Sequence, residues 1–174
     1  MTTEETFLAS IKKIFNNYKA MGEKTFAQLD DEHINYTPNE DTNSIAVIVK
    51  HISGNMLSRW TDFLTEDGEK EWRHRDNEFE NTIKTKQELL EVWGKGWECM
   101  FNAINPLTAD DLLKTVYIRK EPHTVIDAIN RQLAHYASHI GQIIYMAKII
   151  KSSDWESLTI PRNKSKEFNQ KMMG

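Results

Sequence analysis

Apolar residues recur every three or four positions in four long stretches of this chain, and this spacing constrains its fold more than any other feature. The stretches cover about residues 4–29, 44–64, 86–104 and 124–150. A period near 3.6 places the apolar side chains on one face of an α-helix, which must then be buried. Four such helices with two long connections predict an all-α fold, a four-helix bundle.

Two of these helices have a recognisable start in the sequence. Thr85 precedes Glu88 by three residues, which is the spacing of a capping box. Thr124 precedes Asp127 by the same interval. In this arrangement the hydroxyl and the carboxylate each accept a hydrogen bond from a backbone amide that the helix leaves unpaired. We therefore expect helices to begin at these two threonines.

The segments between the helices are polar and show no sustained period. Residues 30–43 contain Pro38 and predict a loop, and residues 65–82 predict a long charged loop. A short helical turn is expected at 108–113 and a short extended piece at 116–118. The tail, residues 151–174, is expected to pack on the body through its scattered apolar residues, Trp155, Leu158, Ile160 and Phe168. No repeat or second domain is apparent, so residues 1–174 predict one domain.

The composition excludes several classes of function. A formal net charge of −4 argues against a nucleic-acid-binding domain, which would normally be basic. No apolar run is long enough to span a bilayer, and the first ten residues carry acids where a signal peptide would be basic. These absences predict a cytoplasmic protein without membrane or nucleic-acid partners. The single cysteine, Cys99, excludes an internal disulfide and is expected to be a buried structural thiol.

Three histidines in two of the predicted helices form a candidate metal site. His135 and His139 are four residues apart, so their imidazoles share one helix face. His51 lies in the second predicted helix, beside its apolar stripe. If these helix faces meet, three neutral imidazoles bind one divalent cation and leave an open position, as in catalytic zinc sites. The alternative is that the three histidines are incidental to each other.

The ligand type limits the choice of metal. Imidazole suits zinc, nickel, iron(II) and manganese, and the spacing does not choose among them. A site without carboxylate disfavours magnesium and calcium. We expect a divalent transition metal, zinc or nickel first, with iron or manganese as alternatives.

Further polar residues lie near the predicted ligands along the chain. Asn55 is one turn from His51 and is the best candidate to hydrogen-bond a ligand, with Gln132 and Tyr136 as weaker candidates. Arg73 and Arg75 could hold an anionic substrate in their planar forks, but we favour the simpler interpretation, in which they belong to a solvated charged loop of ion pairs or to a loop that docks the tail. The remaining histidines are expected to serve other roles: His33 and His74 at the surface, and His123 at a helix start.

The histidine-bearing segments resemble a known family. The segments are NSIAVIVKHISGNMLSRW and INRQLAHYASHIGQIIYMAK, supported by DGEKEWRHRDNEFE and LTIPRNKSKEFN. They look like the DinB/YfiT-like metalloenzymes, and within them an uncharacterised bacterial subfamily. This resemblance extends from the first helix to about Asn169. It implies a bundle of up-down-down-up order, often a homodimer, with a metal held by His51, His135 and His139.

The pattern leaves the reaction open. A metal-dependent hydrolase or transferase acting on a small molecule through a metal-bound water is the first hypothesis. Relatives in the superfamily suggest a thiol-dependent S-transferase or isomerase as the alternative. A third hypothesis is a non-enzymatic metal- or ligand-binding bundle. The third hypothesis is favoured because no Asp or Glu lies beside the histidines on either helix to act as a general base.

Overall fold

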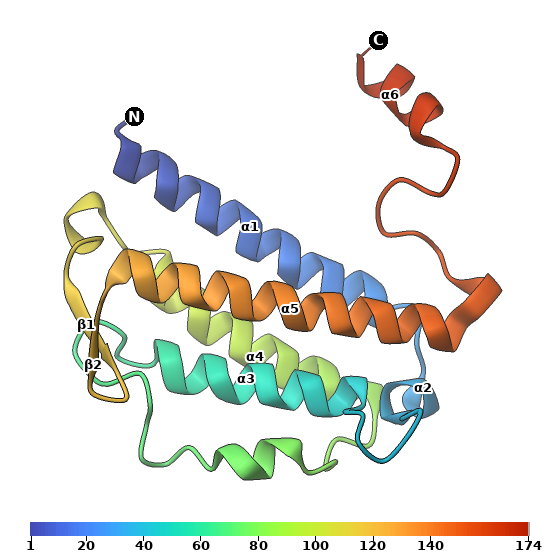
Figure 1. Ribbon diagram of the computed structural model, residues 1–174, viewed down its shortest axis with the longest axis horizontal. Helices are drawn as coiled ribbons and strands as arrows, with labels where there is room; N and C mark the ends of the chain where they lie inside the picture. The colour runs from blue at the N-terminus through green and yellow to red at the C-terminus, as the bar shows by residue number, and fades with distance from the viewer. Residues whose placement is uncertain (174) are drawn as a thin grey trace.

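Residues 1–173 are described by a computed structural model, and within them the chain forms six α-helices, three short 3-10 helices and one two-stranded sheet. The four long helices are α1 (Thr3–Phe26), α3 (Ile45–Trp60), α4 (Lys86–Ile104) and α5 (Val125–Lys151). They lie side by side, with α3 and α4 on one side of α5 and α1 on the other (Figure 1). The prediction of a mainly helical protein is therefore confirmed.

The helix boundaries agree best where the sequence carries capping residues. Thr85 caps α4 through a complete capping box, and the Thr124 side chain accepts a hydrogen bond from the Asp127 amide at the start of α5. The helix expected to continue to residue 64 ends at Trp60, because Thr61 is extended and Asp62 has a left-handed backbone (φ 49°). The first helix likewise ends at Phe26, three residues before the predicted end.

Two predicted loops contain regular structure. The loop expected at 30–43 begins with a short helix, α2 (Asp31–Asn35), because the Asp30 side chain accepts hydrogen bonds from two backbone amides of its first turn. The charged loop between α3 and α4 contains a 3-10 helix, η1 (Arg75–Phe79), and runs back along α3 (Figure 1). This return brings the charged loop against the helix that carries His51.

The extended piece expected near residue 117 is one arm of a hairpin. Strand β1 (Thr115–Ile118) pairs with β2 (Glu121–Thr124), and the predicted turn just before it is the 3-10 helix η2 (Ala109–Asp111). Arg119 and Lys120 form the hairpin turn with left-handed backbones, φ 55° and 65°. Asp67 accepts hydrogen bonds from both of their amides, at 2.8 and 2.7 Å, and so holds the hairpin turn against the charged loop.

The core between the long helices is rich in aromatic rings. Tyr136 of α5 contacts Phe15 of α1 and Trp97 of α4 with ring centroids 5.9 and 5.8 Å apart. Its hydroxyl accepts a hydrogen bond from Trp60 Nε1 at 2.9 Å and donates one to Asn55 Oδ1 at 3.2 Å. The Tyr136 hydroxyl and the Trp60 indole N–H are therefore both satisfied, whereas the buried Nε1 atoms of Trp93 and Trp97 have no partner among the described residues.

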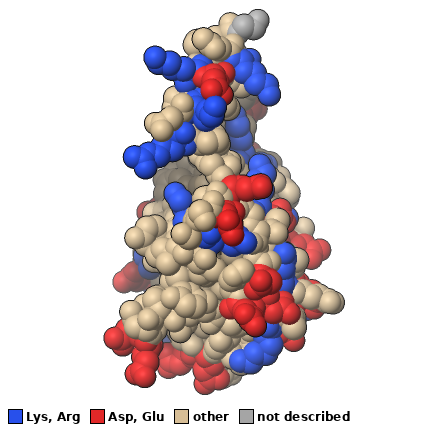
Figure 2. Space-filling view, turned by 90° about the vertical axis from the view of Figure 1, so that its right-hand side faces the viewer, with Lys and Arg blue, Asp and Glu red and all other residues tan. Residues whose placement is uncertain are grey.

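The C-terminal tail packs less than expected. Trp155, which follows the 3-10 helix η3 (Ser152–Asp154), packs against the core, and Glu156 exchanges hydrogen bonds with Gln28. Residues 161–173 are all exposed, and the last helix, α6 (Ser165–Met173), projects from the body (Figures 1 and 2). Pro161 and a left-handed Asn163 (φ 67°) turn the chain away before α6. Gly174, the last residue of the predicted tail, lies outside the described residues.

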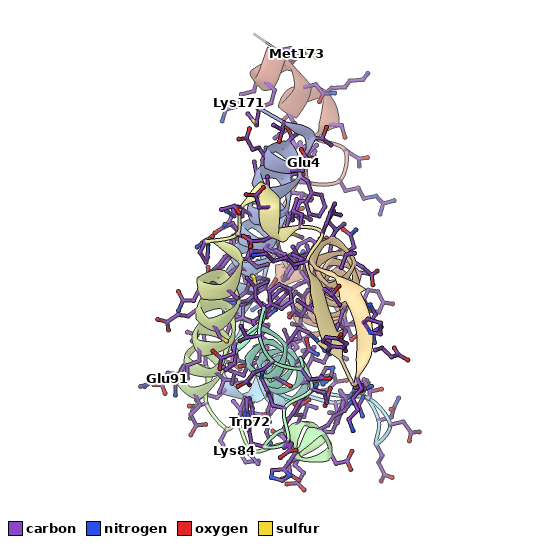
Figure 3. The ribbon with its side chains drawn as sticks, turned by 90° about the vertical axis from the view of Figure 1, so that its left-hand side faces the viewer. Glu4, Trp72, Lys84, Glu91, Lys171 and Met173 are labelled. Atoms are coloured by element: carbon purple, nitrogen blue, oxygen red, sulfur yellow. The ribbon has the colours of Figure 1, made fainter. Side chains whose placement is uncertain are left out.

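The projecting end and the charged loop lie at opposite ends of the molecule. Lys171 and Met173 mark the α6 end, and Trp72 and Lys84 mark the end where the charged loop crosses (Figure 3). Among residues 1–173, no helix is long and apolar enough to cross a membrane.

Two glycines in long helices make a paired test of this packing. A Cβ at Gly22 of α1 would lie 2.3 Å from Cζ2 of the buried Trp93, whereas a Cβ at Gly94 of α4 meets no described atom within 4 Å. We expect Gly22→Ala to lower the free energy of unfolding by about 1–3 kcal/mol through overpacking. Gly94→Ala should raise it by up to about 1 kcal/mol because alanine favours the helix. Urea unfolding measures both, and equal stabilities for the two variants would contradict the packing.

Candidate metal centre

The structure brings His51, His135 and His139 together. His51 projects from α3, and the other two project from α5. The Nε2 atom of His135 lies 3.3 Å from that of His51 and 3.0 Å from that of His139. One ligand atom from each residue can be chosen so that all three lie within 4.8 Å of one another. This cluster, which the sequence predicted, could hold a metal ion.

A buried carboxylate behind His51 was missing from the sequence prediction. Glu78 of η1 is only 6% exposed, and its Oε2 lies 2.9 Å from His51 Nδ1. An ionised Glu78 accepts the Nδ1–H proton, so the lone pair of His51 is left on Nε2, which faces the other two histidines. The only signal in the sequence is an acid beside an aromatic residue, Phe79, whose ring stacks on His51 at 4.9 Å.

A glycine on α3 makes room for this carboxylate. A Cβ at Gly54 would lie 2.3 Å from Glu78 Oε1, so no larger residue could stand there with Glu78 in place. Burial by itself would raise the pKa of Glu78. The hydrogen bonds from His51 and Arg73 outweigh that effect, and the pKa of Glu78 lies below its usual value. Glu78 is therefore ionised at neutral pH.

Arg73 supports Glu78 and is occupied in doing so. Its Nε and Nη2 donate to the two oxygens of Glu78 at 2.8 and 3.0 Å, and its Nη1 lies 3.3 Å from Glu69 Oε2. Burial lowers the pKa of Arg73, but these two carboxylates outweigh burial and raise it. Arg75 is placed differently, because it is exposed with its guanidinium 5.0 Å from the ring centre of Phe79. The prediction that the charged loop contains arginine ion pairs is therefore correct for Arg73, whereas Arg75 forms no ion pair with the described residues.

Of the polar residues predicted to lie near the histidines, two line a pocket and one is turned into the core. Asn55 and Gln132 line a pocket beside His51 and His135. Tyr136 is turned into the core, where it holds Asn55 by the hydrogen bond already described. A further residue, Gln142, lies 2.9 Å from His139 Nδ1 through its Oε1, which orients this imidazole as Glu78 orients His51.

The remaining histidines and the cysteine lie outside the cluster. His33 hydrogen-bonds the start of α2, His74 is exposed, and His123 on β2 pairs with Asp127 at the start of α5. Cys99 is half-buried, with its sulfur 3.6 Å from Thr61 Oγ1. Among the described residues, these three histidines and Cys99 belong to no cluster of potential metal ligands.

Burial keeps the imidazoles of His135 and His139 in the neutral form, which is the form that can bind a metal. It lowers the pKa of His135 to about 3, with further contributions from His139 and His51. It also lowers the pKa of His139, and nearby His51 acts in the same direction. Both groups are therefore neutral at pH 7, and a neutral imidazole can coordinate a metal without first losing a proton.

This shift predicts that the metal-free protein loses stability in acid. Between pH 6.5 and about 3 the unfolded chain binds a proton at His135 that the folded chain does not. Stability therefore rises with pH across this window, and it falls by about 2–4 kcal/mol on acidification if partial exposure is allowed for. Urea unfolding of chelator-treated protein at several pH values measures this, with His135→Gln as the control. Equal pH slopes for the two proteins would contradict the prediction.

Three imidazole donors from two packed helices, with a carboxylate behind one of them, define a helical protein with a candidate metal centre. The chain belongs to the family described as Protein of unknown function (DUF1572), whose model matches residues 2–164. The match ends one residue before α6 begins. No curated protein matches the chain. The family description does not carry the DinB/YfiT-like name, so the narrower resemblance stays a prediction.

Proposed function

We propose that this protein binds a divalent transition metal through His51, His135 and His139 and is a metal-dependent hydrolase or transferase acting on a small molecule. The observation that carries the proposal is the convergence of the histidine Nε2 atoms beside a pocket, with Glu78 behind His51. Three protein ligands are typical of catalytic zinc sites, whereas structural sites usually have four. Zinc or nickel fits the imidazole donors best, with iron or manganese as alternatives.

The protein's own groups have distinct parts in this proposal. A bound divalent metal with an open position would polarise a water molecule or a substrate oxygen. Glu78 and Gln142 orient His51 and His139, and Asn55 and Gln132 offer hydrogen bonds to whatever occupies the adjoining pocket. The described lining of that pocket contains no Asp or Glu, so catalysis by a carboxylate base is not part of the proposal.

A thiol-dependent S-transferase is the second candidate, and the charge of the pocket favours it. Arginines line the pocket beside the histidines, and positive charge stabilises a thiolate relative to its thiol. A thiolate could therefore occupy the same open position. A non-enzymatic metal- or ligand-binding protein is the third candidate.

One screen separates these candidates. Metal-loaded wild-type protein and His135→Ala are tested side by side against ester, amide and thiol-conjugation substrates. Turnover of esters or amides that His135→Ala lacks supports a hydrolase, and thiol-dependent turnover supports the S-transferase. Activities that are uniformly absent, or equal in the two proteins, would contradict an enzyme and favour the binding protein.

We also propose that the four long helices form a DinB-like bundle of up-down-down-up order in a single domain. In two pairs of helices, residues later in one helix contact residues later in the other, which supports parallel pairing of α3 with α4 and of α1 with α5. For α3 and α4 the contacts are Ser53 with Val92 and, just past the end of α3, Thr61 with Cys99. For α1 and α5 they are Phe15 with Tyr136 and, just past both helix ends, Gln28 with Glu156. The homodimer and the cytoplasmic location stay predictions.

A further inference from the structure

The pocket beside the histidines is unusually rich in arginine. It has a volume of about 360 Å³, within the range of pockets that bind small molecules. Five arginines from α3, the charged loop, the hairpin turn and α5 line it: Arg59, Arg73, Arg75, Arg119 and Arg131. His51 and His135 form part of the same wall, so any ligand in the pocket would lie against the candidate metal centre.

Only two carboxylates, Glu69 and Glu78, form ion pairs with these five arginines among the described residues. Glu78 pairs with Arg73, and Glu69 lies 3.3 Å from Arg73, 3.3 Å from Arg119 and 4.0 Å from Arg59. Within residues 1–173, Arg75 and Arg131 have no ion-pair partner. The pocket therefore carries an excess of positive charge even before a metal cation is added.

Arg59 is the pocket residue whose hydrogen-bond donors are least satisfied. It is only 3% exposed, and its Nε and Nη1 atoms are buried without a hydrogen-bond partner among the described residues. Burial lowers the pKa of Arg59, in contrast to Arg73, whose pKa two carboxylates raise. A buried guanidinium with unused donors is costly, and the negative charge of an anion in the adjoining pocket would offset part of that cost.

Other donors surround Arg59. Arg131 lies on α5 one turn before His135, so both project from the same face. Asn55 uses its Oδ1 to accept from Tyr136, which leaves its amide NH₂ group as a donor for the pocket. Two guanidinium forks and an amide can surround a planar carboxylate or a phosphate with charge-assisted hydrogen bonds.

We propose that this pocket binds the carboxylate or phosphate group of a small anionic molecule, held chiefly by Arg59 and Arg131. That this molecule is the substrate rests on the proposed function, because the pocket would then place the reacting part of the molecule at the histidine cluster. Arg73 is a positioning residue, since it acts through Glu78 rather than on the anion.

The test measures anion binding to metal-free protein by isothermal titration calorimetry, with inorganic phosphate and succinate as probes. We expect at least one probe to bind with a Kd of about 1 mM or tighter. Arg131→Gln should weaken this binding about tenfold, and Arg59→Gln tenfold or more, through the loss of charge-assisted hydrogen bonds. Arg131 is exposed, so its variant remains informative if Arg59→Gln folds poorly. Arg162→Gln, in the exposed tail, is the matched control and should bind as wild type.

A fourth variant separates this proposal from the metal site. His139 is not among the residues that line the pocket, so His139→Ala should lose metal and keep phosphate or succinate binding. Arg131→Gln should keep the metal and weaken phosphate or succinate binding about tenfold. Binding of phosphate alone indicates a phosphorylated ligand, and binding of succinate alone a carboxylate. Failure of both probes to bind, equal affinities for Arg131→Gln and Arg162→Gln, or loss of binding in His139→Ala would overturn the proposal.

Discussion

Protein purified without a histidine tag is expected to contain about one divalent transition-metal ion per chain, and the His135→Ala variant is expected to contain none. The reason is the central place of His135, whose Nε2 lies within 3.3 Å of the Nε2 atoms of both other histidines. Without it, two imidazoles from different helices remain, one fewer than the three protein ligands of catalytic zinc sites. Elemental mass spectrometry of both proteins gives the stoichiometry and the identity of the metal.

The control for this experiment is another histidine of the same chain. His74 is exposed and lies outside the cluster, so His74→Ala should keep the metal content of the wild type. Chelation should leave the helical circular dichroism spectrum unchanged, because the aromatic core does not depend on the metal. Wild-type protein that holds no metal after incubation with zinc, nickel, iron(II) and manganese would contradict the site.

Replacing Glu78 by glutamine is expected to weaken metal binding about 10–100-fold, although Glu78 is not among the three proposed ligands. The carboxylate accepts the Nδ1–H bond of His51 at 2.9 Å, which orients the ring and raises the basicity of Nε2. A neutral amide does this less well. Glu78→Gln should also lower the free energy of unfolding of the metal-free protein by about 3 kcal/mol or more, because Arg73 then loses its closest counter-ion in a buried place.

Two further variants isolate these effects. Glu80→Gln makes the same change at an exposed position two residues away and should alter neither quantity. The double variant Arg73→Gln, Glu78→Gln removes both buried charges, so it should recover part of the stability but none of the metal affinity. Competition with a chromophoric chelator measures affinity, and urea unfolding measures stability. A Glu78→Gln protein with wild-type affinity would show that the carboxylate does not support His51.

The long helices were predictable because their evidence is local. The boundaries of α4 and α5 match the prediction within one residue, since Thr85 and Thr124 mark their starts and the apolar period continues to their ends. The ends of α1 and α3 were predicted too late. Leu29 and Phe63 continue the apolar pattern beyond the ends of α1 and α3, and both side chains are buried, but they lie in non-helical segments. Burial of a side chain does not require a helical backbone.

The tail shows the limit of composition as evidence for packing. Phe168 suggested that α6 would lie on the body, yet this side chain is 43% exposed. Apolar residues in a short segment indicate packing only if the chain leads them to an apolar surface, and the turn at Asn163 leads α6 elsewhere. A left-handed asparagine in such a turn has no reliable signal in a single sequence.

The sequence by itself determined the helical architecture and the pairing of His135 with His139, because both follow from the 3.6-residue period of one helix. It also nominated His51, from its place beside an apolar stripe. Only the tertiary structure placed Glu78 behind His51 and drew Arg59, Arg119 and Arg131 into one pocket. These residues lie on different elements or in a loop without periodicity. Their meeting depends on the charged loop folding back along α3, which is decided by packing and ion pairs between residues distant in sequence.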